Sequence, residues 1–205
     1  DTRSLTPATA SQIKDLGHYS EFAKAAYEKD MSSAVKSATG ADVTKTFQGK
    51  LETTRGYVAY DKQRNQVVVG YEGTHNLASA LVDANADQVS YGKTGAKVHR
   101  GFLQSTRETE GQVFAEVDRL RKEHPGATTA FVGHSLGGAQ AVVAASDYAQ
   151  KAGPRGISVR TYGQPAVGDP KFANYYDNLG LDSKRVTNNK DAVPQVPSNY
   201  LNYHH

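Results

Sequence analysis

Apolar residues near the start of the chain recur with the period of one helix face, at Ile13, Leu16, Tyr19, Phe22, Ala23, Ala26 and Tyr27. This spacing predicts an amphipathic helix. Further along, two β-rich runs, 56–60 and 66–71, flank the polar stretch 61–65, which predicts a hairpin. The chain is therefore expected to begin with a helix followed by paired strands.

From about residue 100 onward, helical and extended patterns alternate. A long helix is indicated by Leu103, Val113, Phe114, Val117 and Leu120. It is expected to end at Pro125 and Gly126, which interrupt helices. The segments that follow are predicted as strands over 128–132, 157–162 and 185–187 and as helices over 139–149 and 170–179. Such alternation is typical of an α/β protein with a mostly parallel central sheet flanked by helices.

Composition narrows the class of protein. The 205 residues contain no internal repeat or low-complexity tract, so one domain spanning 1–205 is expected. Charged residues make up 22% of the chain, and no apolar run approaches the roughly 18 residues of a membrane span, so stable membrane insertion is not expected. The net charge of +3 comes from scattered Lys and Arg, which argues against a nucleic-acid-binding surface.

The chain contains no cysteine, which excludes disulfides, thiolate metal sites and a cysteine nucleophile. No His, Asp and Glu cluster has the spacing of metal ligands, so no metal is predicted. The chain begins at Asp1 rather than at an initiator Met, which favours removal of a leader and secretion to the extracellular space.

The segment 133–138, Gly-His-Ser-Leu-Gly-Gly, contains Gly-x-Ser-x-Gly between a predicted strand and a predicted helix. A nucleophile elbow requires small residues on both sides of the serine, because the turn is strained and the helix passes close to the strand. The alternative is a glycine-rich structural turn. The position of this segment between a predicted strand and a predicted helix favours the elbow, with Ser135 as nucleophile.

A serine nucleophile needs a histidine to take its proton and an acid to orient that histidine, in the chain order Ser, acid, His for this fold. Asp191 follows the last predicted strand and is the best candidate for the acid. Asp169, in a Gly-Asp-Pro turn, and Asp182, in a predicted loop, compete with it but are interpreted as solvated loop residues.

Ester hydrolysis also requires donors to the oxyanion of the tetrahedral intermediate. One candidate is the backbone N–H of Leu136, the residue after the nucleophile. A second is Thr74, in the loop that follows the strand ending at Tyr71, although Thr74 could instead be an ordinary strand-end residue.

Four further segments, in order around the elbow, resemble the fungal class 3 lipases, a family that includes feruloyl esterases. They are Gly73-Thr74, similar to an oxyanion segment; 98–102, similar to a His-x-Gly-Phe segment; 162–168, similar to a Tyr-Gly-x-Pro-x-Val-Gly loop; and 191–194, similar to the acid motif. The resemblance covers most of the chain. It implies an α/β-hydrolase fold and supports an oxyanion role for Thr74. Glu72 departs from the arginine usual in the family, and Asn188 departs from a histidine that often precedes the acid motif.

The resemblance also implies a lid after Thr74. One interpretation of this stretch is a short helix that covers the site and opens at a lipid surface, and the alternative is a surface helix packed on the core. The small apolar residues that would form either helix are Leu77, Ala78, Ala80, Leu81 and Val82.

The general base is the main departure from the family, whose catalytic histidine lies well beyond the acid. Only a short stretch follows Asp191, so either the base belongs to a C-terminal part absent from this sequence, which we favour, or His204 or His205 supplies it. The remaining histidines, His18, His75, His99, His124 and His134, all precede the acid. His99 is expected to hold a loop together by hydrogen bonding.

Together these features predict a secreted, monomeric serine hydrolase that cleaves carboxylic esters without a cofactor. Triacylglycerols at a lipid–water interface are the first expected substrate class. The alternatives are a feruloyl or other carboxylesterase, and a non-catalytic lipase-like binding protein or fragment.

Overall fold

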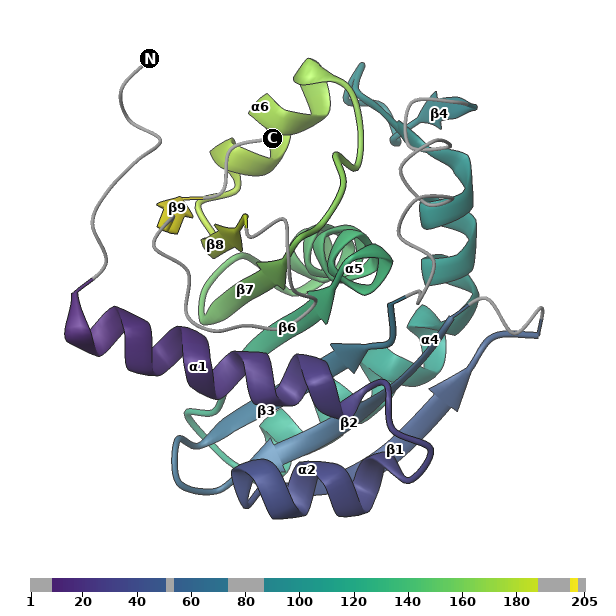
Figure 1. The fold of residues 1–205 in the computed structure, drawn as a ribbon. Coiled ribbons are helices and arrows are strands. Elements are labelled where there is room, and N and C mark those ends of the chain that lie inside the picture. The colour runs from purple at the N-terminus through teal and green to yellow at the C-terminus, as the bar shows by residue number, and fades with distance from the viewer. Residues whose placement is uncertain (1–8, 51–53, 74–86, 188–199, 203–205) are drawn as a thin grey trace.

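The computed structural model describes residues 9–50, 54–73, 87–187 and 200–202 (Figure 1). Its main sheet has the order β1-β2-β3-β6-β7-β8-β9, and β4 pairs separately with β5. The strands are β1 (Asp42–Gln48), β2 (Arg55–Asp61), β3 (Gln66–Tyr71), β4 (Gln88–Ser90), β5 (Lys97–His99), β6 (Thr128–His134), β7 (Ile157–Tyr162), β8 (Asp182–Val186) and β9 (Tyr200–Asn202). The helices are α1 (Ala10–Ala25), α2 (Met31–Thr39), α4 (Arg100–Glu123), α5 (Leu136–Ala152) and α6 (Pro170–Asn178).

The centre of the main sheet is parallel. Strands β3, β6, β7 and β8 run in the same direction, while β1 and β2 on one side and β9 on the other are antiparallel to their neighbours. The predicted mostly parallel sheet and the β2–β3 hairpin are confirmed. Because parallel strands end at the same edge, the turn after β6 lies at the edge where sites of open α/β sheets form.

Helices cover both faces of the sheet, with α1 and α2 on one face and α4 and α5 on the other (Figure 1). Alternate residues of β6 pack against opposite faces of the sheet: Ala130 and Val132 pack on the face covered by α1 and α2, and Phe131 packs on the face covered by α4 and α5. This alternation follows from the two-residue repeat of strand side chains. The apolar centre of β6 is therefore buried on both faces, as expected for a central parallel strand.

Capping residues set the bounds of the first two helices. Thr9 caps α1 in a capping box with Gln12, and α1 ends before Tyr27, which the apolar pattern had included. Asp30 caps the start of α2, and Gly40 ends it in the left-handed conformation that glycine adopts without a Cβ clash. Tyr27 thus lies in the connection between two helices.

Two of the segments that resemble family motifs lie against each other. Val98 of β5 bridges to Gly168, and the His99 N–H donates to the Val167 carbonyl at 2.9 Å. A Cβ on Gly168 would lie 2.2 Å from the Lys97 carbonyl oxygen, so only glycine fits there. The small β4–β5 sheet is thereby fixed to the loop that follows β7.

The prediction of the last parallel strand over 185–187 is wrong in extent: β8 spans Asp182–Val186, because it pairs with β7 from Ser158 onward. The predicted lid after Thr74 lies outside the described residues.

Candidate active site

Ser135 occupies the turn between β6 and α5 with φ 56° and ψ −123°. A positive φ is uncommon for a residue with a Cβ and costs on the order of 1–3 kcal/mol. Its N–H donates to the Tyr162 carbonyl at 2.9 Å, and its own carbonyl accepts from Gly138 at 3.0 Å. The serine backbone is therefore held in a strained conformation by the neighbouring strand and the first helical turn.

Glycines around Ser135 allow the close approach of backbone that the turn requires. A Cβ on Gly133 would lie 2.3 Å from the carbonyl carbon and oxygen of Gly137, and one on Gly137 would lie 2.4 Å from the Tyr71 carbonyl oxygen. Real Cβ atoms do not approach backbone atoms so closely. The glycines of the Gly-x-Ser-x-Gly pattern thus let α5 start directly against the ends of β3 and β6.

We expect Gly137→Ala to lower the free energy of unfolding by about 3 kcal/mol, because the added methyl group overpacks against fixed backbone. Urea unfolding would measure the change. Gly111→Ala is the matched control: Gly111 lies on α4, and a Cβ there meets nothing within 4 Å. That variant should be neutral or slightly more stable, since alanine favours helix. Equal effects of the two substitutions would contradict this account of the turn.

The Ser135 side chain is fully buried, and its hydroxyl has no hydrogen-bond partner among the described residues. It does not cap α5, although it lies at the N-cap position where serine usually does so. A buried hydroxyl without a partner costs free energy. The hydroxyl is thus positioned at some cost to stability and is uncommitted to the fold.

Leu136 is the first residue of α5, so its N–H has no acceptor within the helix. Within the described part of the chain no other backbone acceptor reaches it. A helix N-terminus carries partial positive charge and favours a nearby anion. The Leu136 N–H therefore offers a donor directly beside the Ser135 hydroxyl.

Thr74 and Asp191 lie outside the described residues, as do His75, His204 and His205. The chain can be followed to Gly73, where a Cβ would lie 2.2 Å from the carbonyl oxygen of His134. The residue before Thr74 in the sequence is thus packed directly against the turn that carries Ser135.

The histidines in the described ranges are engaged elsewhere. Nδ1 of His99 accepts the N–H of Gly101 at 3.1 Å and caps α4, which confirms the expected loop-holding role. His18 pairs with Asp61 at 3.2 Å, and His124 stacks on Tyr60 with ring centroids 3.7 Å apart. Since the Ser135 hydroxyl has no partner in this part of the chain, none of these rings acts on it here.

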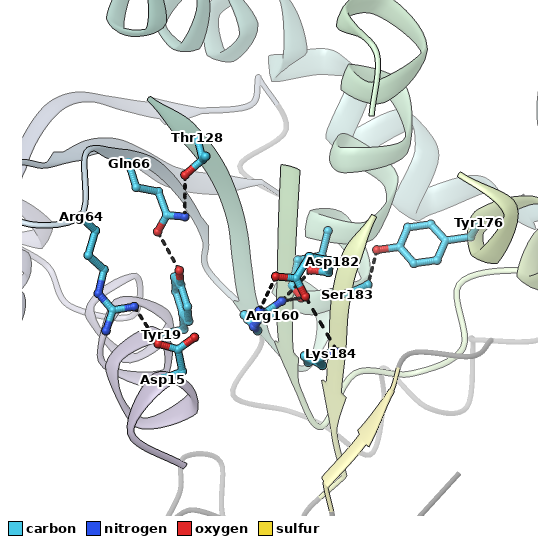
Figure 2. Close-up of polar contacts among 11 residues, drawn as sticks. Asp15, Tyr19, Arg64, Gln66, Thr128, Arg160, Tyr176, Asp182, Ser183 and Lys184 are labelled. Carbon is cyan, nitrogen blue, oxygen red and sulfur yellow. Dashed lines mark hydrogen bonds and ion pairs between the residues drawn. The ribbon is translucent and has the colours of Figure 1, made fainter. Parts of the chain in front are cut away.

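The two competing acids have structural partners. Asp169 caps α6 by accepting the Phe172 N–H at 2.8 Å. Asp182 lies on β8, not in the loop predicted for it, and pairs with the buried Arg160 at 2.9 Å (Figure 2). The strand pairing with β7 places it there. Both carboxylates therefore have structural roles in the fold, and Asp191 stays the predicted triad acid.

Sequence reasoning missed two residues close to the turn, Tyr27 and Arg55. The Tyr27 hydroxyl is hydrogen-bonded to Nδ1 of His134. Burial, and then the charge of Glu72, raises the pKa of the Tyr27 phenol. Arg55 forms an ion pair with Glu72 at 3.2 Å, so the glutamate that replaces the family's usual arginine has a cationic partner. No local signal could reveal these contacts, because they join residues far apart in the sequence.

No helix in the described ranges is long and apolar enough to cross a membrane. Over the same residues, no group of three or more His, Cys, Asp or Glu side chains is arranged to hold a metal ion.

Comparisons with known proteins agree with this geometry. The family described as Lipase (class 3) matches residues 68–201. The chain is 31% identical to a lipase of Rhizopus niveus over all of this chain and 55% of that protein, and 35% identical to the "Secreted mono- and diacylglycerol lipase 1" of Fusarium solani over 87% and 50%. It therefore spans about half the length of these curated relatives. A solved triacylglycerol lipase, whose catalytic centre is described as a serine protease triad, superposes with a TM-score of 0.83 at 28% identity, covering 96% of this chain and 79% of that one.

Proposed function

The chain belongs to the class 3 lipase family and has its α/β-hydrolase fold, and on that premise we propose that it hydrolyses carboxylic esters with Ser135 as nucleophile. The observation that carries the proposal is the Ser135 hydroxyl, which is buried in a strained turn at the start of α5 and has no hydrogen-bond partner among the described residues. Such strain persists where it serves chemistry.

In the proposed reaction the Ser135 oxygen attacks the ester carbonyl carbon, and its proton passes to a histidine. The negative charge that develops on the carbonyl oxygen is held by the N–H of Leu136 and by Thr74. Collapse of the intermediate breaks the bond to the alcohol, which leaves with the proton from the histidine. Water then attacks the acyl-serine by the same route, releasing the acid and restoring the hydroxyl.

Asp191 is proposed to orient the histidine and stabilise its charged form. The histidine itself is assigned outside the described residues, because each described ring has the other contacts given above. No cofactor enters this scheme. Residues 1–205 are proposed to belong to a single domain.

The relative named a secreted mono- and diacylglycerol lipase supports acylglycerols as the substrate class and secretion as the destination. We place the reaction at a lipid–water interface, carried out by a monomer. Hydrolysis of a trioleoylglycerol emulsion should then exceed hydrolysis of methyl ferulate, and the opposite order would favour a feruloyl-type esterase.

A fluorophosphonate tests the nucleophile directly, because it forms a stable bond only with an activated serine. Intact mass spectrometry should show one adduct per chain, located at Ser135 by peptide mapping. Folded protein that gains no adduct at Ser135 would overturn the proposal.

A further inference from the structure

One guanidinium holds the connection between α1 and α2, residues 26–29, which we call the strap. Nη1 of Arg55 donates to the Ala26 carbonyl at 3.1 Å, and Nη2 donates to the carbonyls of Glu28 at 2.8 Å and Lys29 at 3.1 Å. Arginine suits this task because its planar fork presents several donors at once. The strap is thus fixed to the first residue of β2.

The same guanidinium reaches the end of β3. Nη1 of Arg55 donates to the Glu72 carboxylate at 3.2 Å, and both side chains are about one quarter exposed. The backbone N–H of Glu72 also donates to the Arg55 carbonyl at 2.7 Å. Arg55 therefore joins the strap to the residue that precedes Gly73 and Thr74.

Tyr27, in the middle of the strap, contacts the nucleophile turn. Its hydroxyl is hydrogen-bonded to Nδ1 of His134, the residue before Ser135, and the centroids of the two rings lie 5.6 Å apart. Burial raises the pKa of the Tyr27 phenol, so the hydroxyl stays protonated and is able to donate to Nδ1 when that nitrogen carries no proton. A Cβ on Gly73 would lie 2.3 Å from the Tyr27 oxygen, so this hydroxyl also packs against Gly73.

The Tyr27 hydroxyl thus lies where the end of β3 meets the turn after β6. The strained serine needs its flanking residues fixed, and His134 is fixed through its ring by Tyr27. A displacement of about 1 Å between a nucleophile and its oxyanion donors can cost about a hundredfold in rate. Contacts that fix these two segments relative to each other can therefore affect catalysis without touching the substrate.

We propose that Tyr27 is a positioning residue: through its contacts with His134 and Gly73 it fixes Ser135 and the Leu136 N–H relative to the end of β3. The inference rests on the proposed function. It assigns Tyr27 a role that the sequence pattern, which placed it on an apolar helix face, did not suggest.

Tyr27→Phe removes the hydroxyl alone. We expect kcat for p-nitrophenyl butyrate, corrected for the fraction of active sites, to fall about tenfold while KM stays within twofold. The matched control is Tyr19→Phe on α1, because the Tyr19 hydroxyl donates to Gln66 at 2.8 Å (Figure 2). Gln66 begins β3, so this bond lies at the end of the strand opposite to Gly73. Tyr19→Phe loses a comparable buried bond and should keep the wild-type kcat. An active wild type whose kcat is unchanged in Tyr27→Phe would overturn the proposal.

Amide hydrogen exchange tests the same idea without turnover. The Ser135 N–H is protected by its bond to the Tyr162 carbonyl. Tyr27→Phe should speed its exchange about tenfold or more, while amides in the middle of β3 and β6 keep their rates. If the wild type shows no ester hydrolysis, the proposed function fails, yet this measurement still decides the role of Tyr27. Unchanged exchange at Ser135 would refute it.

Discussion

Ser135→Ala is expected to lower kcat for p-nitrophenyl butyrate by about 10⁴-fold or more. The reason is that the proposed mechanism forms its only covalent bond to the enzyme through this oxygen. A small residual rate can persist, because the Leu136 N–H would still stabilise an oxyanion formed by attack of water. Initial rates under matched enzyme concentrations would measure the loss.

The same substitution should leave the protein as stable as the wild type, or more so. The Ser135 hydroxyl is buried and unpartnered in the described part of the chain, so alanine removes a polar group that contributes no bond to the fold. A large loss of rate without a loss of stability is typical of residues retained for chemistry. Thermal unfolding of both proteins would separate the two effects.

Ser146→Ala is the matched control for this experiment. Ser146 is a fully buried serine of α5, the helix that follows Ser135, but its hydroxyl donates to the Val142 carbonyl at 2.8 Å. Its removal should cost about 1 kcal/mol of stability and leave kcat unchanged. If both variants retained full activity, Ser135 could not be the nucleophile.

The turn at Ser135 could be predicted from sequence because its determinants are local. A buried strand, small residues at fixed offsets and an alanine-rich helix follow one another without a gap, and Gly133 avoids a clash with the backbone of Gly137 four residues later. The hairpin of β2 and β3 was equally local, since a short polar turn joins its strands. Where the physical cause lies within a few residues, pattern and structure agree.

Most of the missed features depend on distant partners. Strand β8 starts at Asp182 because β7 pairs with it, although its own sequence is polar. Helix α2 does carry a local signal, with Asp30 before it and Gly40 after it, that could have identified it. Tyr27 and Arg55 show no such signal, since their roles come from contacts with His134 and Glu72.

Two acidic side chains meet between α4 and α5, close to β4. Asp147 is nearly buried and accepts from the Tyr91 hydroxyl at 2.5 Å and from Nε of Arg107 at 3.1 Å. Burial, the hydrogen bond with Asp147 and the charge of that carboxylate raise the pKa of Glu110 to about 10. Burial alone would raise the pKa of Asp147, but hydrogen bonds from Glu110, Arg107 and Tyr91 outweigh it and hold that pKa low.

The pair therefore holds one proton in the folded protein, on Glu110, across the neutral range. In the unfolded chain Glu110 releases it near its ordinary pKa of 4.5. Between these two values the folded state binds one more proton than the unfolded state, so rising pH favours unfolding. The expected slope for one proton is about 1.4 kcal/mol of stability lost per pH unit.

Glu110→Gln should remove this slope. The glutamine amide can donate to the Asp147 carboxylate as the protonated Glu110 does, but it does not titrate. We expect the two proteins to have similar free energies of unfolding near pH 5. Above that pH the stability of the variant relative to the wild type should rise steadily, and the difference should reach several kcal/mol at pH 9. Urea unfolding at each pH gives both curves. Their difference reports on the Glu110–Asp147 pair, because the ionisable groups outside the pair are common to both proteins.

Glu123→Gln is the matched control, because it makes the same chemical change at an exposed position. Glu123 ends α4, is 56% exposed and pairs only with Arg119 at 2.8 Å and, more distantly, with His124 among the described residues. Its variant should follow the wild-type curve, since an exposed surface ion pair contributes little to stability. Burial raises the pKa of Tyr91 and Tyr71 as well, so these phenols stay protonated and do not obscure the result. Parallel curves for the wild type and Glu110→Gln would mean that Glu110 takes up no proton on folding and that Arg107 offsets one of the two negative charges of the pair.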